Sequence, residues 1–189
     1  MIDKSSLSMQ EAIAKVHDGA TVLIGGFGTA GQPAELIDAL IAHGAKDLTI
    51  VNNNAGNGDI GLAALLKAGQ VKKIICSFPR QSDSYIFDEL YRAGKIELEL
   101  VPQGNLACRI QAAGMGLGPI YTPTGFGTLL AEGKPTLNYE GKDFVLTTNP
   151  NGSIGESYRE EIKTLKDNGY VIPTNPASDG LYHVTKGRK

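Results

Sequence analysis

The sequence predicts an α/β domain with an open, mainly parallel sheet and helices on both faces, followed by an atypical C-terminal part. Three observations support this fold class. Short apolar runs alternate with segments whose apolar residues recur at helical spacing. The connections between these segments are short, which is typical of parallel strands joined by crossover helices. Finally, 189 residues of which 41% are hydrophobic can bury the core of an ordinary domain.

The predicted elements alternate regularly through the first half of the chain. Ser8 and Glu11 have the spacing of a capping box, so a first helix is expected to begin after Ser8. The strand at 96–101 alternates apolar and acidic residues, which favours a position near a sheet edge. We expect strands at 21–24, 48–51, 72–78 and 96–101, and further helices at 33–44, 60–68, 84–93 and 105–113.

The composition changes in the last part of the chain. Glu140 and Gly141 form a turn signal that predicts a hairpin between residues 139 and 146. Beyond residue 147 the sequence predicts a charged helix at 158–168 and two short strands, at 170–172 and 181–184. We therefore expect one domain over residues 1–147 and a divergent segment over residues 148–189.

A glycine-rich turn at residues 25–31 joins the strand 21–24 to the following helix. Glycines allow a close approach of the backbone to a ligand, and the start of a helix favours an anion or a carbonyl oxygen. Residues 26–31 also match GxGxxG, the dinucleotide fingerprint, which expects an acidic residue about 20 positions further on. Asn52 and Asn53 stand there instead. A Rossmann-type NAD-dependent oxidoreductase therefore stays open, but it ranks behind the two other functions considered below.

Composition argues against several other classes of protein. The net charge of −2 and the lack of a basic block argue against nucleic-acid binding. No apolar run approaches the roughly 20 residues of a membrane span, and the first residues do not resemble a signal peptide, so we expect a cytoplasmic protein. Cys76 and Cys108 lack CxxC spacing and nearby histidines, so we expect buried free thiols rather than a metal or a redox site.

Amide side chains follow two of the predicted strands. Residues 52–54 are three asparagines directly after the strand 48–51, and Gln103 follows the strand 96–101. Such amides either form Asx turns or supply neutral donors to an oxyanion or a thioester. The residues alone thus suggest a donor-lined site for a carbonyl or a carboxylate. They do not reveal a nucleophile.

Several motifs in order carry a family resemblance. They are residues 18–33, 53–56, 77–81, 102–105 and 122–128. Over roughly residues 1–147 the chain resembles the A (alpha) subunit of family I CoA-transferases, and within that family the 3-oxoadipate branch, with succinyl-CoA as donor. The resemblance implies a ping-pong exchange through a glutamyl-CoA thioester. It also implies that the glutamate belongs to a B (beta) subunit, and no matching glutamate segment occurs here.

The resemblance implies a supporting half-site in this chain. Residues 25–28 would shape the wall around the thioester, amides would contact the acyl and carboxylate groups, and residues 124–127 would border the entry. The implied substrate- and CoA-binding residues are Gly25, Gly26, Phe27, Gly28, Asn53, Asn54, Gln103, Thr124, Gly125 and Gly127. The implied partner is the beta subunit, in a hetero-oligomer. No cofactor is implied beyond the CoA thioester substrate.

The last residues depart from the family pattern. Alpha subunits of the family continue with further strands, whereas residues 146–189 resemble none of them. An alternative function is therefore a truncated or rearranged, inactive relative that acts as a binding or assembly protein.

Overall fold

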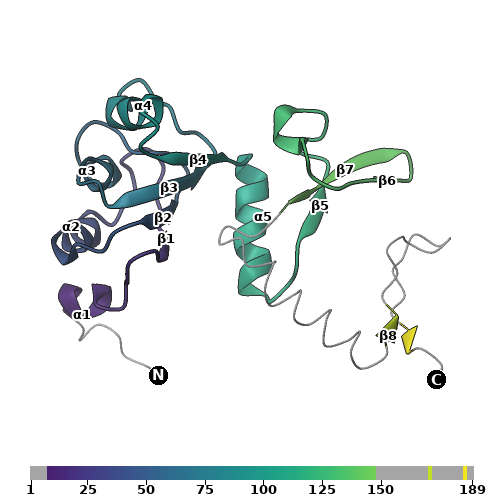
Figure 1. Ribbon diagram of the computed structural model, residues 1–189, viewed down its shortest axis with the longest axis horizontal. Helices are drawn as coiled ribbons and strands as arrows, with labels where there is room; N and C mark the ends of the chain where they lie inside the picture. The colour runs from purple at the N-terminus through teal and green to yellow at the C-terminus, as the bar shows by residue number, and fades with distance from the viewer. Residues whose placement is uncertain (1–7, 148–169, 172–184, 187–189) are drawn as a thin grey trace. The chain divides into compact units, whose positions relative to one another are not determined.

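The computed structural model describes residues 8–147, 170–171 and 185–186 (Figure 1). The chain divides into two compact units, Met1–Leu106 and Ala107–Lys189, and each is described by itself. The predicted helix 158–168 and the predicted strand 181–184 lie outside the described residues. The expected domain boundary at residue 147 stays a prediction.

The first unit contains the predicted alternation of strands and helices. Ser8 caps the first helix, and its side chain and that of Glu11 form the predicted capping box. The elements are α1 (Met9–Ile13), β1 (Thr21–Leu23), α2 (Ala34–His43), β2 (Leu48–Val51), α3 (Leu62–Lys67), β3 (Val71–Cys76), α4 (Tyr85–Arg92) and β4 (Glu97–Leu100).

Helix α3 and strand β3 have bounds that differ from those expected. Helix α3 begins at Leu62 rather than at residue 60, because Gly61 has a φ of 52°, which is outside the helical region. Strand β3 ends at Cys76 rather than at Phe78. The amide groups of Ser77 and Phe78 donate instead to the carbonyl oxygen of Asn53, at 3.2 and 3.0 Å.

The four strands form the parallel sheet that the sequence predicts, in the order β1-β2-β3-β4. Strand β4 lies at an edge, as its alternating acidic residues indicate. Each strand is adjacent to the next one in the chain, so the right-handed crossovers place α2, α3 and α4 on one face. Figure 1 shows these three helices side by side along the sheet.

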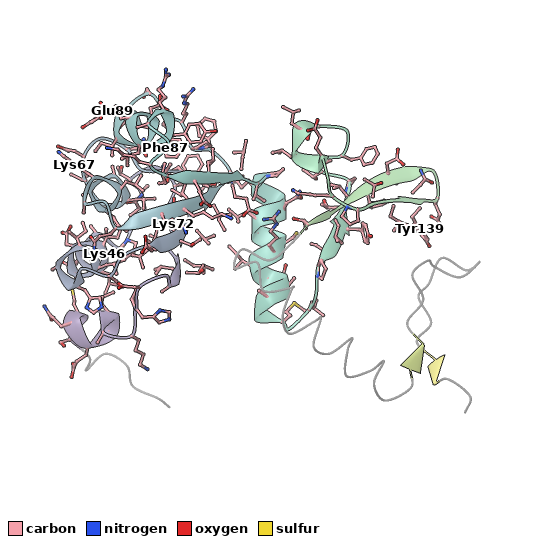
Figure 2. All side chains as sticks on the ribbon, in the orientation of Figure 1. Lys46, Lys67, Lys72, Phe87, Glu89 and Tyr139 are labelled. Atoms are coloured by element: carbon pink, nitrogen blue, oxygen red, sulfur yellow. The ribbon has the colours of Figure 1, made fainter. Side chains whose placement is uncertain are left out.

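The core of the first unit is divided between the two faces of the sheet. Ile50 and Ile74 belong to the large cluster that packs under α2, α3 and α4, and Phe87 of α4, labelled in Figure 2, is 2% exposed in that cluster. Val51 and Ile75 point to the other face, where they cluster with Val101 and with Leu106 at the start of the next helix. The strands therefore carry apolar residues on both faces, as expected for a parallel sheet.

The second unit contains a small antiparallel sheet. Helix α5 (Gln103–Gly114) crosses the boundary between the units, and the strands β5 (Ile120–Thr122), β6 (Thr136–Tyr139) and β7 (Lys142–Thr147) pair in the order β5-β7-β6. A short 3₁₀ helix, η1 (Leu129–Ala131), precedes β6. The predicted hairpin is confirmed, with Glu140 and Gly141 at φ values of 49° and 76°. Two positive φ values are typical of a type I′ turn.

The remaining described strands form a two-residue ladder. Strand β8 (Tyr170–Val171) overlaps the predicted strand 170–172, and it pairs antiparallel with β9 (Thr185–Lys186). Among the described residues, no helix combines the length and the apolar character that crossing a membrane requires.

Candidate functional site

The candidate site of the first unit lies at the carboxyl ends of the parallel strands, where open α/β sheets bind ligands. The glycine-rich loop, residues 25–31, follows β1, and the asparagines follow β2. The segment that begins at Ser77 follows β3. Gln103 lies in the first turn of α5 rather than in the loop that the sequence suggested, because α5 begins directly after Pro102.

The glycine-rich loop folds back on itself in a way that requires glycine at position 26. Phe27 and Ala30 exchange two backbone hydrogen bonds, of 2.9 and 3.1 Å, and Phe27 is 62% exposed. Gly26 has a φ of 121°, and a Cβ there would lie 2.7 Å from Cγ of Gln32. A Cβ on Gly25, in contrast, would have no atom within 4 Å. A side chain at position 26 would therefore displace Gln32 or open the loop.

Gln32 holds the far end of this loop. Its Nε2 donates to the carbonyl oxygen of Gly28 at 2.7 Å, and its Oε1 accepts from the amide of Leu62 at 3.3 Å. The side chain thus connects the glycine-rich loop to the first turn of α3. Gln32 was not among the residues predicted for the site, although its place between the glycines and Pro33 was a visible signal.

The structure brings Asn53 and Gln103 together, although they are 50 residues apart. Nε2 of Gln103 donates to Oδ1 of Asn53 at 2.7 Å, and Oγ of Ser77 donates to the same oxygen at 3.0 Å. Two donors on one oxygen fix the orientation of the Asn53 amide. Its Nδ2 is buried and has no hydrogen-bond partner among the described residues. Gln103 itself is exposed.

Asn54 lies differently from Asn53, since its side chain is fully buried. Its Nδ2 donates to Oδ1 of Asn57 at 2.7 Å, and its backbone amide donates to Oδ1 of Asn52 at 2.9 Å. These contacts direct the Asn54 side chain into the loop. Its implied contact with the acyl or carboxylate group of a substrate stays a prediction.

A second set of polar side chains, which was not part of the predicted site, continues from Asn57. Nδ2 of Asn57 donates to Oδ1 of Asp83 at 2.5 Å and also to Oε1 of Gln81. A Cβ on Gly28 would lie 3.6 Å from that Gln81 oxygen. The loops after β1, β2 and β3 therefore meet at one amide cluster. Their common place after strands was a signal that could have suggested this cluster.

Of the two cysteines expected to be buried, Cys76 is buried at the end of β3, beneath these loops, whereas Cys108 is exposed, so that expectation was wrong for Cys108. Cys76 is no candidate nucleophile. Burial raises the pKa of its thiol to about 12, and a backbone hydrogen bond from Phe78 offsets only part of this effect. The thiol therefore stays protonated at neutral pH, whereas nucleophilic attack requires the thiolate. Among the described residues no cluster of three or more metal-ligating side chains occurs.

The remaining predicted residues, Thr124, Gly125 and Gly127, lie in the second unit. The loop is held locally, since Oγ1 of Thr128 donates to the carbonyl oxygen of Gly125 at 2.7 Å. An open hollow of about 660 Å³ adjoins it, and the residues that line it are Phe126, Gly127, Thr128, Leu129, Ala131, Glu132 and Thr136. The expected place of this loop at the entry of the site stays a prediction.

The loops of the candidate site fall within a match to a known family. The coenzyme A transferase family matches residues 6–154, which is most of the chain. The chain belongs to the coenzyme A transferase family. Every loop of the candidate site lies inside the matched residues.

Individual CoA-transferases show how far the likeness extends. The A subunit of the 3-oxoadipate CoA-transferase of Acinetobacter baylyi is 82% identical over 146 residues, which are 77% of this chain and 64% of the relative. The A subunit of a probable succinyl-CoA:3-ketoacid coenzyme A transferase of Bacillus subtilis is 44% identical over 147 residues, 78% of this chain and 61% of the relative. The chain thus spans under two thirds of the length of these curated relatives.

A solved CoA-transferase supports the fold. The crystal structure of glutaconate coenzyme A-transferase from Acidaminococcus fermentans matches with a TM-score of 0.66 and 23% identity, over 76% of this chain and 53% of the other. The predicted fold class, an α/β protein with a parallel sheet flanked by helices, is confirmed.

Proposed function

We propose that this chain is the alpha (A) subunit of a two-chain CoA-transferase that moves CoA from succinyl-CoA to a 3-oxo acid, with 3-oxoadipate as the favoured acceptor. The observation that carries the proposal is the 82% identity to the A subunit of a 3-oxoadipate CoA-transferase over 146 residues, 77% of the chain. The name of the Bacillus subtilis relative supports succinyl-CoA as the donor.

The site suits a substrate with a carbonyl or carboxylate group. Gln103 is exposed and uses one N–H of its amide for Asn53, so the second N–H remains for an oxygen of the substrate. Asn53, held by Gln103 and Ser77, keeps that amide in place. Neutral donors fixed in advance stabilise negative charge that develops on a thioester oxygen.

The proposed reaction needs a glutamate nucleophile, and the loops at residues 25–33, 52–61 and 77–84 contain no glutamate. Asp83 is the carboxylate bonded to the amide cluster, and its Oδ1 already accepts from Asn57. In the proposed enzyme the beta subunit supplies a glutamate that attacks the thioester carbonyl, an acyl anhydride forms and the CoA thiolate leaves. The thiolate then attacks the glutamyl carbonyl, which releases the acyl carboxylate and leaves glutamyl-CoA. The carboxylate of the acceptor acid then attacks glutamyl-CoA, and the same steps in reverse order give the CoA thioester of the acceptor and the free glutamate.

The dinucleotide alternative is disfavoured by the position of Asn52. An acidic residue at the end of β2 would have to face the ribose of the cofactor. Instead, Asn52 is 3% exposed, and its amide donates to the carbonyl oxygens of Ile24 and Gly25. The side chain at this point therefore faces the protein.

The test is reconstitution of the two chains. We expect this chain and a beta subunit to co-purify, and CoA transfer from succinyl-CoA to 3-oxoadipate to occur only in the mixture. Transfer by this chain alone would contradict the assignment of the nucleophile to the partner. A complex without transfer would favour the inactive assembly protein, and thermal stabilisation by NAD would favour the oxidoreductase.

A further inference from the structure

Asn52 lies at a junction between the loops that follow β1 and β2. Its backbone amide continues the sheet by donating to the carbonyl oxygen of Ile75 at 3.1 Å. Its side chain turns the other way, where Nδ2 donates to the carbonyl oxygens of Ile24 and Gly25 at 2.6 and 3.3 Å. Its Oδ1 accepts from the backbone amide of Asn54 at 2.9 Å. All of these partners are main-chain groups.

The side chain of Asn52 bonds to the segment after β1 at the point where main-chain hydrogen bonds between the first two strands end. The last main-chain bond between β1 and β2 runs from the amide of Ile24 to the carbonyl oxygen of Val51, at 2.9 Å. Beyond it the glycine-rich loop leaves the sheet, and the Asn52 amide is what connects its first residue, Gly25, to the other loop. Asn52 is 3% exposed and its side-chain hydrogen bonds all go to main-chain groups, which suits a role in positioning other residues rather than in contacting a substrate.

The backbone on either side of Asn52 carries the proposed half-site. Gly25 begins the wall of the thioester site, and Asn53 is the next residue in the chain and holds Gln103. We propose that Asn52 is a positioning residue that sets the distance between this wall and the Asn53–Gln103 donor pair. The inference rests on the proposed function, but the bridge itself is measurable in the chain without its partner.

The test substitution is Asn52→Asp in the full chain. Aspartate has nearly the same shape and keeps an oxygen for the amide of Asn54. It replaces the Nδ2 donor by an oxygen that faces two carbonyl oxygens, so the ionised side chain cannot bridge to Ile24 and Gly25, and a protonated one can donate to only one of them. Asn52→Ser is the second variant, because it also removes the bridge and buries no charge. If Asn52→Asp does not fold, Asn52→Ser replaces it in every measurement.

The chain offers a matched control in Gln70→Glu. Gln70 is 5% exposed, and its Nε2 also donates to two carbonyl oxygens, those of Leu40 and Ala45 at 3.3 and 3.0 Å. It directly precedes β3, so it lies at the opposite end of the sheet from the candidate site. The control therefore removes the same kind of buried amide donor without contact with the site loops, and the thermal stability of both variants is measured for comparison.

Two measurements decide the inference. In the complex with the beta subunit, we expect Asn52→Asp to lower kcat by roughly 10- to 100-fold, because a misplaced site loop costs that order of rate. The KM for succinyl-CoA should change by much less, and Gln70→Glu should keep a kcat close to that of the wild type. In the free chain, hydrogen exchange over residues 25–31 should be faster in Asn52→Asp than in Gln70→Glu.

The outcomes separate this inference from the proposed function. Equal losses of kcat in the two variants, or equal exchange over residues 25–31, would overturn the positioning role of Asn52. An inactive wild-type complex would instead refute the proposed function, and the exchange measurement would still decide whether Asn52 holds the loop.

Discussion

Both ends of the parallel sheet contain buried side-chain amides, but only the carboxyl end combines them with long loops and exposed side chains. At the amino end, short turns connect helix to strand, as where Gly69 and Gln70 join α3 to β3. At the carboxyl end, longer loops run through residues 25–33, 52–61 and 77–84, and side-chain amides hold them together with isolated backbone bridges. Buried amides alone therefore do not mark a site. The carboxyl end adds exposed groups, such as Gln103 and Phe27, to a fixed framework.

Glycine substitutions should show the largest difference between the two ends. Gly56 follows β2 with a φ of 90°, and a Cβ there would lie 2.6 Å from the backbone nitrogen of Ala63. Gly69 at the amino end has a φ of 70° and no atom within 4 Å of the Cβ position. We expect Gly56→Ala to lower the free energy of unfolding by about 3 kcal/mol or more, because strain and overlap add. Gly69→Ala should cost only about 1–2 kcal/mol.

Denaturant unfolding of both variants measures this comparison. Equal losses would show that the loop after β2 adapts to a side chain at position 56, and that the carboxyl end is less rigid than its contacts indicate.

The amide pair Asn53–Gln103 should show the next largest effect, in rate rather than in stability. We expect Gln103→Ala to lower kcat of the two-chain complex by about 100-fold, the loss typical of removing one fixed donor at a developing oxyanion. Thermal stability should hardly change, because Gln103 is exposed. Gln111→Ala is the matched control, an exposed glutamine in the same helix.

The double variant tests whether the pair acts as one unit. If Asn53 acts by holding Gln103, then Asn53→Ala combined with Gln103→Ala should be little slower than Gln103→Ala alone. Additive losses would mean that each amide contacts the substrate independently.

Gly25→Ala tests whether Gly25 lines the thioester site or only shapes the loop. A methyl group at this position meets no atom within 4 Å, so the melting temperature should stay close to that of the wild type. If residue 25 faces the thioester, the KM for succinyl-CoA should rise several-fold because the methyl group narrows the site. An unchanged KM would remove Gly25 from the wall.

The fold followed from the sequence because its main signals are local. Apolar runs and helical spacing predicted β1 to β4 and the helices between them, and Glu140-Gly141 predicted the hairpin. Strand β5 was missed, because three residues after a glycine-rich segment carry too little periodicity, and its pairing with β7 is distant in the chain.

The site was only partly predictable for a related reason. Asn53 and Gln103 were expected at strand ends, and parallel strands bring such ends to one edge. The contacts of Asn57 with Gln81 and Asp83 depend on loop backbones with glycines at positive φ, such as Gly56 and Gly58. Amino-acid spacing does not specify those conformations.

The smallest expected effect concerns the interior beneath the carboxyl-end loops. The pKa of Cys76 is raised from 9.0 to about 12 by burial, so above pH 9 the unfolded chain loses a proton that the folded chain keeps. The contribution of the protonated Cys76 thiol to the free energy of unfolding is therefore fully present below pH 9 and is lost as the pH rises toward 12.

Between pH 9 and 10 we expect the wild type to lose up to about 1 kcal/mol of unfolding free energy more than Cys76→Ala. Cys108 is exposed, so Cys108→Ala should retain the wild-type dependence on pH. A parallel loss in all three proteins would mean that water reaches Cys76, and that the amide-held loops do not seal this end of the sheet.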